Sequence, residues 1–112
     1  MKKIISRIKN KFFRTCENNI NYSTMLKMQR ENKSIIVLDV RTRDEYAYNH
    51  LKGAINIPLH EITQKVSRYV TNKNAVIIVY CEYGGRSQKA ANKLEKMGYV
   101  NVYNLDGGIQ GI

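Results

Sequence analysis

The 112-residue sequence contains no tryptophan, one proline and only two cysteines. The cysteines, Cys16 and Cys81, are too few for the disulfide framework of a small secreted protein, and they favour a reducing compartment such as the cytoplasm. The two histidines, His50 and His60, lie at no ligand spacing, so we expect no metal site. Long apolar runs are also missing, since no stretch approaches the roughly 20 residues that a membrane-spanning helix needs.

Acidic residues are scarce. Nine Asp and Glu stand against nineteen Lys and Arg, which gives a net charge of +10. Residues 1–33 carry nine basic and two acidic residues, a net charge of +7, whereas residues 34–112 carry only +3. The strong basicity is therefore a property of the N-terminal third of the chain.

Residues 1–18 are expected to form a basic amphipathic extension. Apolar side chains recur near helical spacing with Lys and Arg between them. We favour a helix that packs on its own domain or a solvated tail, and the alternative is a weak contact with an anionic membrane surface. Nucleic-acid binding is not expected, because no aromatic-rich groove motif accompanies the charge. The apolar residues of this segment are Ile4, Ile5, Ile8, Phe12 and Phe13.

Residues 19–112 are expected to form one domain in which strands and helices alternate. A chain of this length, 43% hydrophobic, supports a single core. Short β-branched runs alternate with segments of helical spacing, which predicts an α/β domain with a mainly parallel sheet. The predicted strands are 34–40, 53–57, 75–80 and 100–105, and the predicted helices are 43–48, 61–70 and 87–97.

Cys81 directly follows the strongest predicted strand, which is where α/β proteins place their ligand crevices. Gly84 and Gly85 allow the loop to turn several backbone N–H groups inward, and Arg86 and a helix beginning at Ser87 add positive potential. These features favour thiolate over thiol and so predict a lowered pKa for Cys81. The alternative is a buried, inert cysteine at the end of a strand.

Four segments in register resemble the rhodanese-like sulfurtransferases. The loop CEYGGRS at residues 81–87 is similar to the active-site loop of that family, Cys-x-x-Gly-x-Arg-Ser. The other three similar segments are LDVRTRDEY at 38–46, HLKGAINIP at 50–58 and GYVNVYNLDGG at 98–108. The resemblance covers roughly residues 20–112, and it implies a three-layer sandwich with helices on both faces of the sheet.

The resemblance also implies a reaction. The Cys81 thiolate would take the sulfane sulfur of thiosulfate or of a persulfide donor, hold it as a cysteine persulfide, and pass it to a thiol or to cyanide. The acceptor thiol could belong to a small molecule or to a protein, and no metal or organic cofactor is implied. Backbone amides of the loop would stabilise the outer sulfur and Arg86 would help to hold an anionic donor. The binding residues implied are Glu82, Tyr83, Gly84, Gly85, Arg86 and Ser87.

Other residues of the resembling segments have less chemical roles. Arg41 lies where the family lines the crevice, and it is a further binding candidate, although we favour an ion pair with Glu45. Asp39 and His50 are expected to be structural, with His50 hydrogen-bonded rather than acting as a base. His60 is expected at the surface and Cys16 as a plain free thiol.

Three departures from the family pattern carry expectations of their own. Glu82 would repel a dianionic donor if it faced the pocket, and we expect it to point to solvent. Tyr83 is bulky and would narrow the pocket mouth. The chain ends soon after Gly108, so we expect C-terminal packing to be lost or replaced by the N-terminal helix.

Two other functions remain as alternatives. Cysteine phosphatases and arsenate reductases use a similar thiolate loop, but with five residues between cysteine and arginine, whereas four separate Cys81 from Arg86. A shorter loop encloses a smaller volume, better suited to one sulfur atom than to a tetrahedral oxyanion. The second alternative is a non-catalytic binding module, which the presence of Cys81 disfavours.

Overall fold

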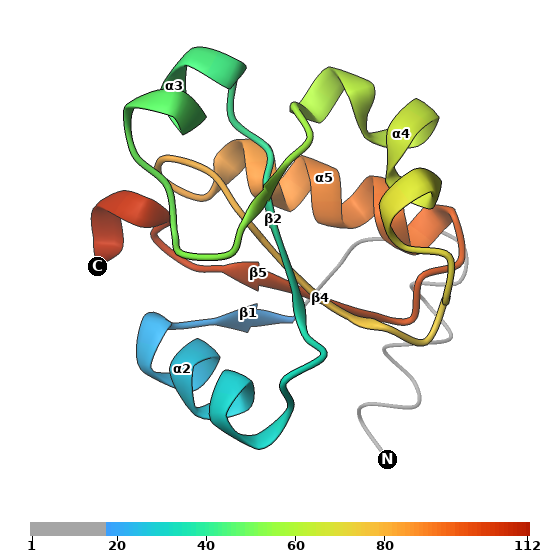
Figure 1. The fold of residues 1–112 in the computed structure, drawn as a ribbon, viewed down its shortest axis with the longest axis horizontal. Coiled ribbons are helices and arrows are strands. Elements are labelled where there is room, and N and C mark those ends of the chain that lie inside the picture. The colour runs from blue at the N-terminus through green and yellow to red at the C-terminus, as the bar shows by residue number, and fades with distance from the viewer. Residues whose placement is uncertain (1–17) are drawn as a thin grey trace.

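The computed structural model describes residues 18–112, and these form one parallel β-sheet with helices on both faces (Figure 1). The sheet has the strand order β1-β5-β4-β2-β3, and every neighbouring pair of strands is parallel. The predicted three-layer α/β class is therefore confirmed. The strands are β1 (Asn19–Ile20), β2 (Ile36–Asp39), β3 (Ile55–Asn56), β4 (Val76–Tyr80) and β5 (Asn101–Leu105).

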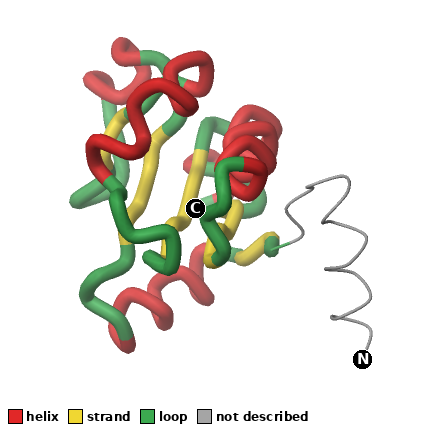
Figure 2. Tube along the Cα trace, turned by 90° about the vertical axis from the view of Figure 1, so that its right-hand side faces the viewer, coloured by secondary structure: helices red, strands yellow, loops and turns green. Residues whose placement is uncertain are grey.

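Helices connect the strands and cover the sheet, with the strands lying between them (Figure 2). Within residues 18–112, no helix has the length and apolar character needed to cross a bilayer. The helices are α2 (Tyr22–Glu31), α3 (Arg43–Tyr48), α4 (Ile62–Tyr69) and α5 (Gly85–Lys96), and two short 3-10 helices are η1 (Leu59–Glu61) and η2 (Ile109–Gly111).

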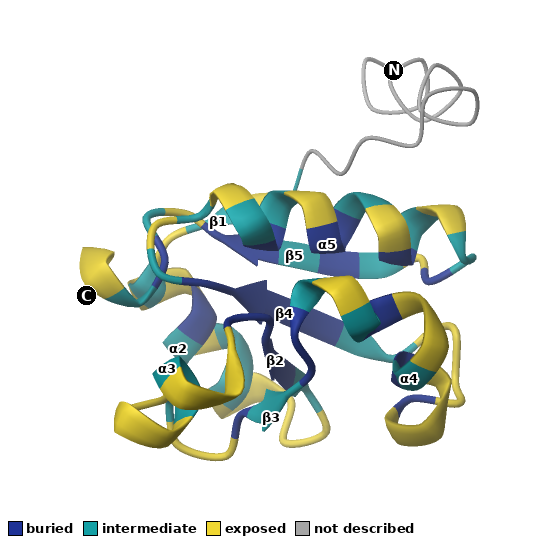
Figure 3. Cartoon of the chain, turned by 90° about the horizontal axis from the view of Figure 1, so that it is seen from above, coloured by how far each residue is buried: buried dark blue, intermediate teal, exposed yellow. Residues whose placement is uncertain are grey.

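The core lies on both faces of the central strand β4. Ile77 and Val79 point into the cluster that α4 and α5 cover, whereas Ile78 and Tyr80 point into the cluster that α2 covers. All four side chains are fully buried, as the dark blue of β4 indicates (Figure 3). Burial of such a side chain stabilises the fold by about 1.5–3 kcal/mol, so an uninterrupted apolar run is what a central parallel strand requires.

The predicted elements are largely confirmed, although several are shorter. The strand predicted at 53–57 is reduced to Ile55–Asn56, and the helix predicted from Ser87 already begins at Gly85. β1 and α2 were not predicted. The side chain of Asn21 caps α2 by accepting the N–H of Thr24 at 2.8 Å, a local signal that the sequence does contain.

The extension predicted at residues 1–18 falls outside the described residues except for Asn18. The packing, solvated and membrane interpretations of that segment therefore stay predictions.

Candidate functional site

Cys81 follows β4 at the centre of the carboxyl edge of the sheet. Its side chain is only 1% exposed and belongs to the core cluster beneath α5. β4 lies between β2 and β5, so the segments that leave these two strands at the same edge adjoin the cysteine. Because the strand is buried on both sides, it holds the cysteine on a rigid support.

Donors from the following loop converge on the Cys81 sulfur. The N–H of Gly84 donates to Sγ at 3.0 Å and the N–H of Ser87 at 3.3 Å. The Ser87 hydroxyl oxygen lies 3.3 Å from Sγ. Gly84 adopts a φ of 120°, which L side chains rarely reach, and this conformation precedes the first residue of α5. The loop therefore places the sulfur at the N-terminal end of α5.

These contacts set the ionisation of the thiol. Burial raises the pKa of Cys81, but hydrogen bonds from the Ser87 hydroxyl and from the N–H groups of Ser87, Gly84 and Tyr83 outweigh it and hold the pKa below its ordinary value. The Ser87 hydroxyl also lies 3.0 Å from the carbonyl oxygen of Gly84. Because the hydroxyl has one proton, it can donate to only one of these two acceptors at a time.

The double glycine after β5 supports the loop from behind. Ile109 N–H donates to the carbonyl of Cys81 at 2.9 Å, and Gln110 N–H donates to the carbonyl of Glu82 at 3.0 Å. Gly108 has a φ of 61°, and a Cβ placed on it would lie 2.5 Å from each of these two carbonyl oxygens. η2 therefore packs directly on the loop that carries Cys81, and the expectation that further C-terminal packing is lost or replaced by the N-terminal helix stays a prediction.

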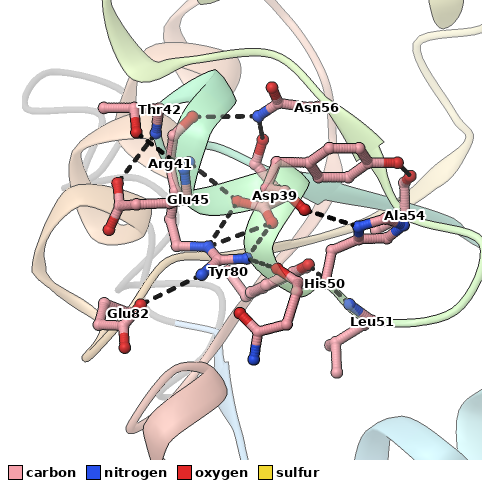
Figure 4. A network of polar contacts seen from close by, with 12 residues as sticks. Asp39, Arg41, Thr42, Glu45, His50, Leu51, Ala54, Asn56, Tyr80 and Glu82 are labelled. Carbon is pink, nitrogen blue, oxygen red and sulfur yellow. Dashed lines mark hydrogen bonds and ion pairs between the residues drawn. The ribbon is translucent and has the colours of Figure 1, made fainter.

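Arg41 joins the end of β2 to the same loop (Figure 4). Its buried guanidinium contacts the carboxylate of Asp39 at 2.7 Å and Oε1 of Glu82 at 3.1 Å, and it donates to the carbonyl of Asn49 at 2.6 Å. The expected ion pair between Arg41 and Glu45 is therefore wrong. The expectation that Glu82 points to solvent is also wrong, because its side chain is 24% exposed and its charge is compensated by Arg41.

Arg86 pairs with Glu45 instead. The two guanidinium nitrogens donate to the two carboxylate oxygens at 2.7 and 2.9 Å, a bidentate pair between α5 and α3. The Arg86 hydrogen bond, with further donors from Thr42, lowers the pKa of Glu45 to about 2 despite partial burial. Glu45 and Thr42 also form the capping box that begins α3. Arg86 thus stands beside the cysteine loop with its charge already matched.

The remaining predicted residues have the following places. His50 lies with Nδ1 2.8 Å from the carbonyl oxygen of Tyr46, and its ring stacks on the Tyr46 ring at 3.7 Å. The expected hydrogen bond is therefore present, and the structural role of His50 stays a prediction. The His60 side chain is 81% exposed, as expected. Tyr83 is 73% exposed at the tip of the cysteine loop, and Gly85 is also exposed.

Two contributors were missed by sequence reasoning. Asn56 donates to the carbonyls of both Asp39 and Arg41 at 3.0 Å and so fixes the turn after β2. Gln110 contacts the carboxylate of Glu82 through its side-chain amide. Asn56 lies inside the family-like segment HLKGAINIP, so the sequence does contain a signal for it, whereas no local pattern distinguishes Gln110.

The geometry describes a site that favours a thiolate at Cys81. Backbone N–H groups, a hydroxyl and a helix end face the sulfur, and two ion pairs hold the surrounding loops in place. The site contains two guanidinium groups and three carboxylates, so its surplus positive potential comes from the amides rather than from the side chains.

Comparisons with known proteins find relatives over most of the chain. The thiosulfate sulfurtransferase PspE of Escherichia coli is 41% identical over 75 residues, which cover 67% of this chain and 71% of that protein. A tRNA uridine(34) hydroxylase of Buchnera aphidicola is 36% identical over 83 residues, which cover 70% of this chain but only 27% of that protein. A solved structure of a rhodanese with anions from E. coli superposes with a TM-score of 0.65 at 40% identity, covering 70% of this chain and 91% of that one.

The relatives share the domain but not one activity, since their names include sulfurtransferases and a tRNA hydroxylase. The family model of the rhodanese-like domain matches residues 22–112, which include every residue of the site described above. The chain therefore belongs to the rhodanese-like domain family.

Proposed function

We propose that this protein is a sulfurtransferase that carries sulfane sulfur on Cys81. The observation that supports it most directly is the convergence of Gly84 N–H, Ser87 N–H and the Ser87 hydroxyl on Sγ. These donors hold the pKa of the thiol below its ordinary value, so the nucleophilic thiolate is more abundant at a given pH than in an ordinary cysteine. They would also face a second sulfur bonded to Sγ and stabilise its charge.

In the loading step, the Cys81 thiolate attacks the outer sulfur of thiosulfate. The Sγ–S bond forms as the S–S bond of thiosulfate breaks, and the bonding pair leaves with sulfite. Three negative charges enter and three leave, one on the persulfide and two on sulfite. A persulfide donor reacts in the same way and releases its thiolate. The loop amides from Glu82 to Ser87 would hold the donor, and Arg86, which already pairs with Glu45, would flank it.

In the unloading step, a thiolate or cyanide attacks the outer sulfur of the persulfide. The Sγ–S bond breaks, its electron pair returns to Cys81, and the acceptor leaves as a persulfide or as thiocyanate. No external oxidant or reductant enters the balance. Two cysteines in the whole chain suit a reducing compartment, which keeps the Cys81 and acceptor thiols free of disulfides, so we place the reaction in the cytoplasm.

The proposal is tested by thiosulfate:cyanide and thiosulfate:thiol transfer with the wild type, Cys81→Ser and the matched control Cys16→Ser. We expect Cys81→Ser to abolish transfer while circular dichroism stays unchanged, and Cys16→Ser to keep wild-type activity. Mass spectrometry of protein incubated with thiosulfate should show an adduct of about 32 Da, one sulfur atom, on the peptide with Cys81. Full activity in a folded Cys81→Ser protein, or aryl phosphate hydrolysis as fast as sulfur transfer, would contradict the proposal.

A further inference from the structure

The outer face of α5 carries a row of lysines that begins beside the cysteine loop. Lys89, Lys93 and Lys96 are all exposed, and their spacing of four and three residues puts them on one face of the helix. The opposite face, with Ala90, Ala91 and Leu94, is buried against the sheet, as the division of α5 into yellow and dark blue indicates (Figure 3). We refer to Lys89, Lys93 and Lys96 as the α5 ridge.

The ridge carries positive charge that the site itself does not use. Arg41 and Arg86 are matched by Asp39, Glu82 and Glu45, so the side chains around Cys81 hold no surplus positive charge. Within residues 18–112, in contrast, no lysine of the ridge forms an ion pair. A fixed positive potential therefore extends along α5, away from the loop.

The length of the ridge points to a large ligand. Lys89 and Lys96 are seven residues apart, which at the rise of an α-helix is about 10 Å along the axis. Thiosulfate or a small thiol, held at Cys81, cannot span that distance. A protein surface can, and potentials of opposite sign would steer it and align it before transfer.

We infer that the α5 ridge docks an acidic protein that presents its acceptor cysteine to the Cys81 persulfide. This inference rests on the proposed sulfur transfer, and the partner is identified by its acidic surface and its acceptor cysteine. The acceptor thiolate attacks the outer sulfur, the Sγ–S bond breaks, a new persulfide forms on the partner, and Cys81 returns as thiolate. Because Cys81 is 1% exposed, the acceptor cysteine must lie on a projecting segment that reaches over Tyr83 and Gly85.

The test uses two synthetic peptides that differ only in charge. Each has one cysteine, flanked by about six Asp and Glu residues in the first and by Asn and Gln in the second, so that electrostatic steering is the one variable. Full-length protein is loaded with thiosulfate, and transfer of sulfur to each peptide is followed by mass spectrometry. We expect the second-order rate constant for the acidic peptide to be at least about tenfold higher at about 20 mM salt, and the difference to vanish at about 500 mM.

Two charge-reversal variants locate the effect. Lys89→Glu/Lys93→Glu/Lys96→Glu should remove the preference for the acidic peptide, whereas the control Lys27→Glu/Arg30→Glu/Lys33→Glu should keep it. The control has the same change in net charge and lies on or just after α2, on the other face of the sheet. Both variants should keep wild-type thiosulfate:cyanide activity, so a failure of docking is distinguished from a failure of sulfur transfer.

Binding of the fluorescently labelled acidic peptide to unloaded protein gives a readout independent of the reaction. Loss of binding in the ridge variant alone supports the inference. Equal rates and equal binding for the two peptides with wild-type protein would overturn it, as would an equal loss in the α2 control. Tighter, salt-sensitive binding of a single-stranded RNA oligonucleotide at the same lysines would overturn it in favour of a nucleic-acid partner.

Discussion

Gly108 is the position where a single methyl group should disturb the site most. A Cβ there would lie 2.5 Å from the carbonyl oxygens of both Cys81 and Glu82, which are backbone atoms, and it would sit at a φ of 61°. To reach an ordinary van der Waals separation of 3.4–4 Å, the two segments must part by about 0.9–1.5 Å, which breaks the fit of η2 on the loop. Gly53 is the matched control, because its φ is 79° and a Cβ there meets no atom within 4 Å.

Both substitutions to alanine incur the cost of a positive φ, about 1–3 kcal/mol. Gly108→Ala adds an overpacking cost of about 1–3 kcal/mol, so its melting temperature should lie a further 4–20 °C or so below that of Gly53→Ala. Because the loop moves with the Cys81 carbonyl, kcat/KM for sulfur transfer should fall about 10- to 100-fold in Gly108→Ala and stay near wild type in Gly53→Ala. Scanning calorimetry and the thiosulfate:cyanide assay measure the two effects. Equal melting temperatures and equal activities for the two variants would refute the argument.

Alkylation of Cys81 by iodoacetamide should have a pH midpoint below the free-thiol value of about 8.5, and Ser87→Ala should raise it, whereas Cys16 should titrate near the free-thiol value. Identical midpoints for the two cysteines would contradict the role of the loop. Since folding lowers the pKa of Cys81, the thiolate's contribution to the free energy of unfolding is present above the unfolded-state pKa and is lost as the pH falls through the folded-state pKa. Arg41→Met should lower the free energy of unfolding by about 3–5 kcal/mol, because it leaves a buried carboxylate without its partner. The exposed Arg43→Met serves as control in urea denaturation, and an equally small effect for both would show that the buried pair is dispensable.

Most of the sheet could be predicted because its signals are local. The β4 segment is apolar at every position since both of its faces are covered, and α5 shows its buried face through Ala90, Ala91 and Leu94. α2 escaped prediction because it buries only Met25 completely, so its apolar pattern is weak. β1 has two residues and exists only through its pairing with β5, which no local pattern encodes.

The ion pairs around the site were predicted less well. Spacing within one segment favoured a pair between Arg41 and Glu45, but the fold gives each of them a partner 41 residues away in the chain, Glu82 and Arg86 respectively. A charged side chain on a loop can reach several oppositely charged partners, and the local sequence does not distinguish among them. The choice among them depends on which segments the sheet order brings together, and that order is a property of the whole chain.

The local sequence is enough to predict a reactive thiol and its place: a cysteine after a buried central strand, glycines that free the loop amides, and a helix that begins at once. These features depend on residue type and on short spacing, so they can be predicted from the sequence. How that loop is held depends on contacts that form only in the folded domain. The support of Cys81 by Gly108, the pairing of Glu82 with Arg41, and the pairing of Arg86 with Glu45 all join segments distant in sequence. They exist because the carboxyl ends of parallel strands meet at one edge of the sheet.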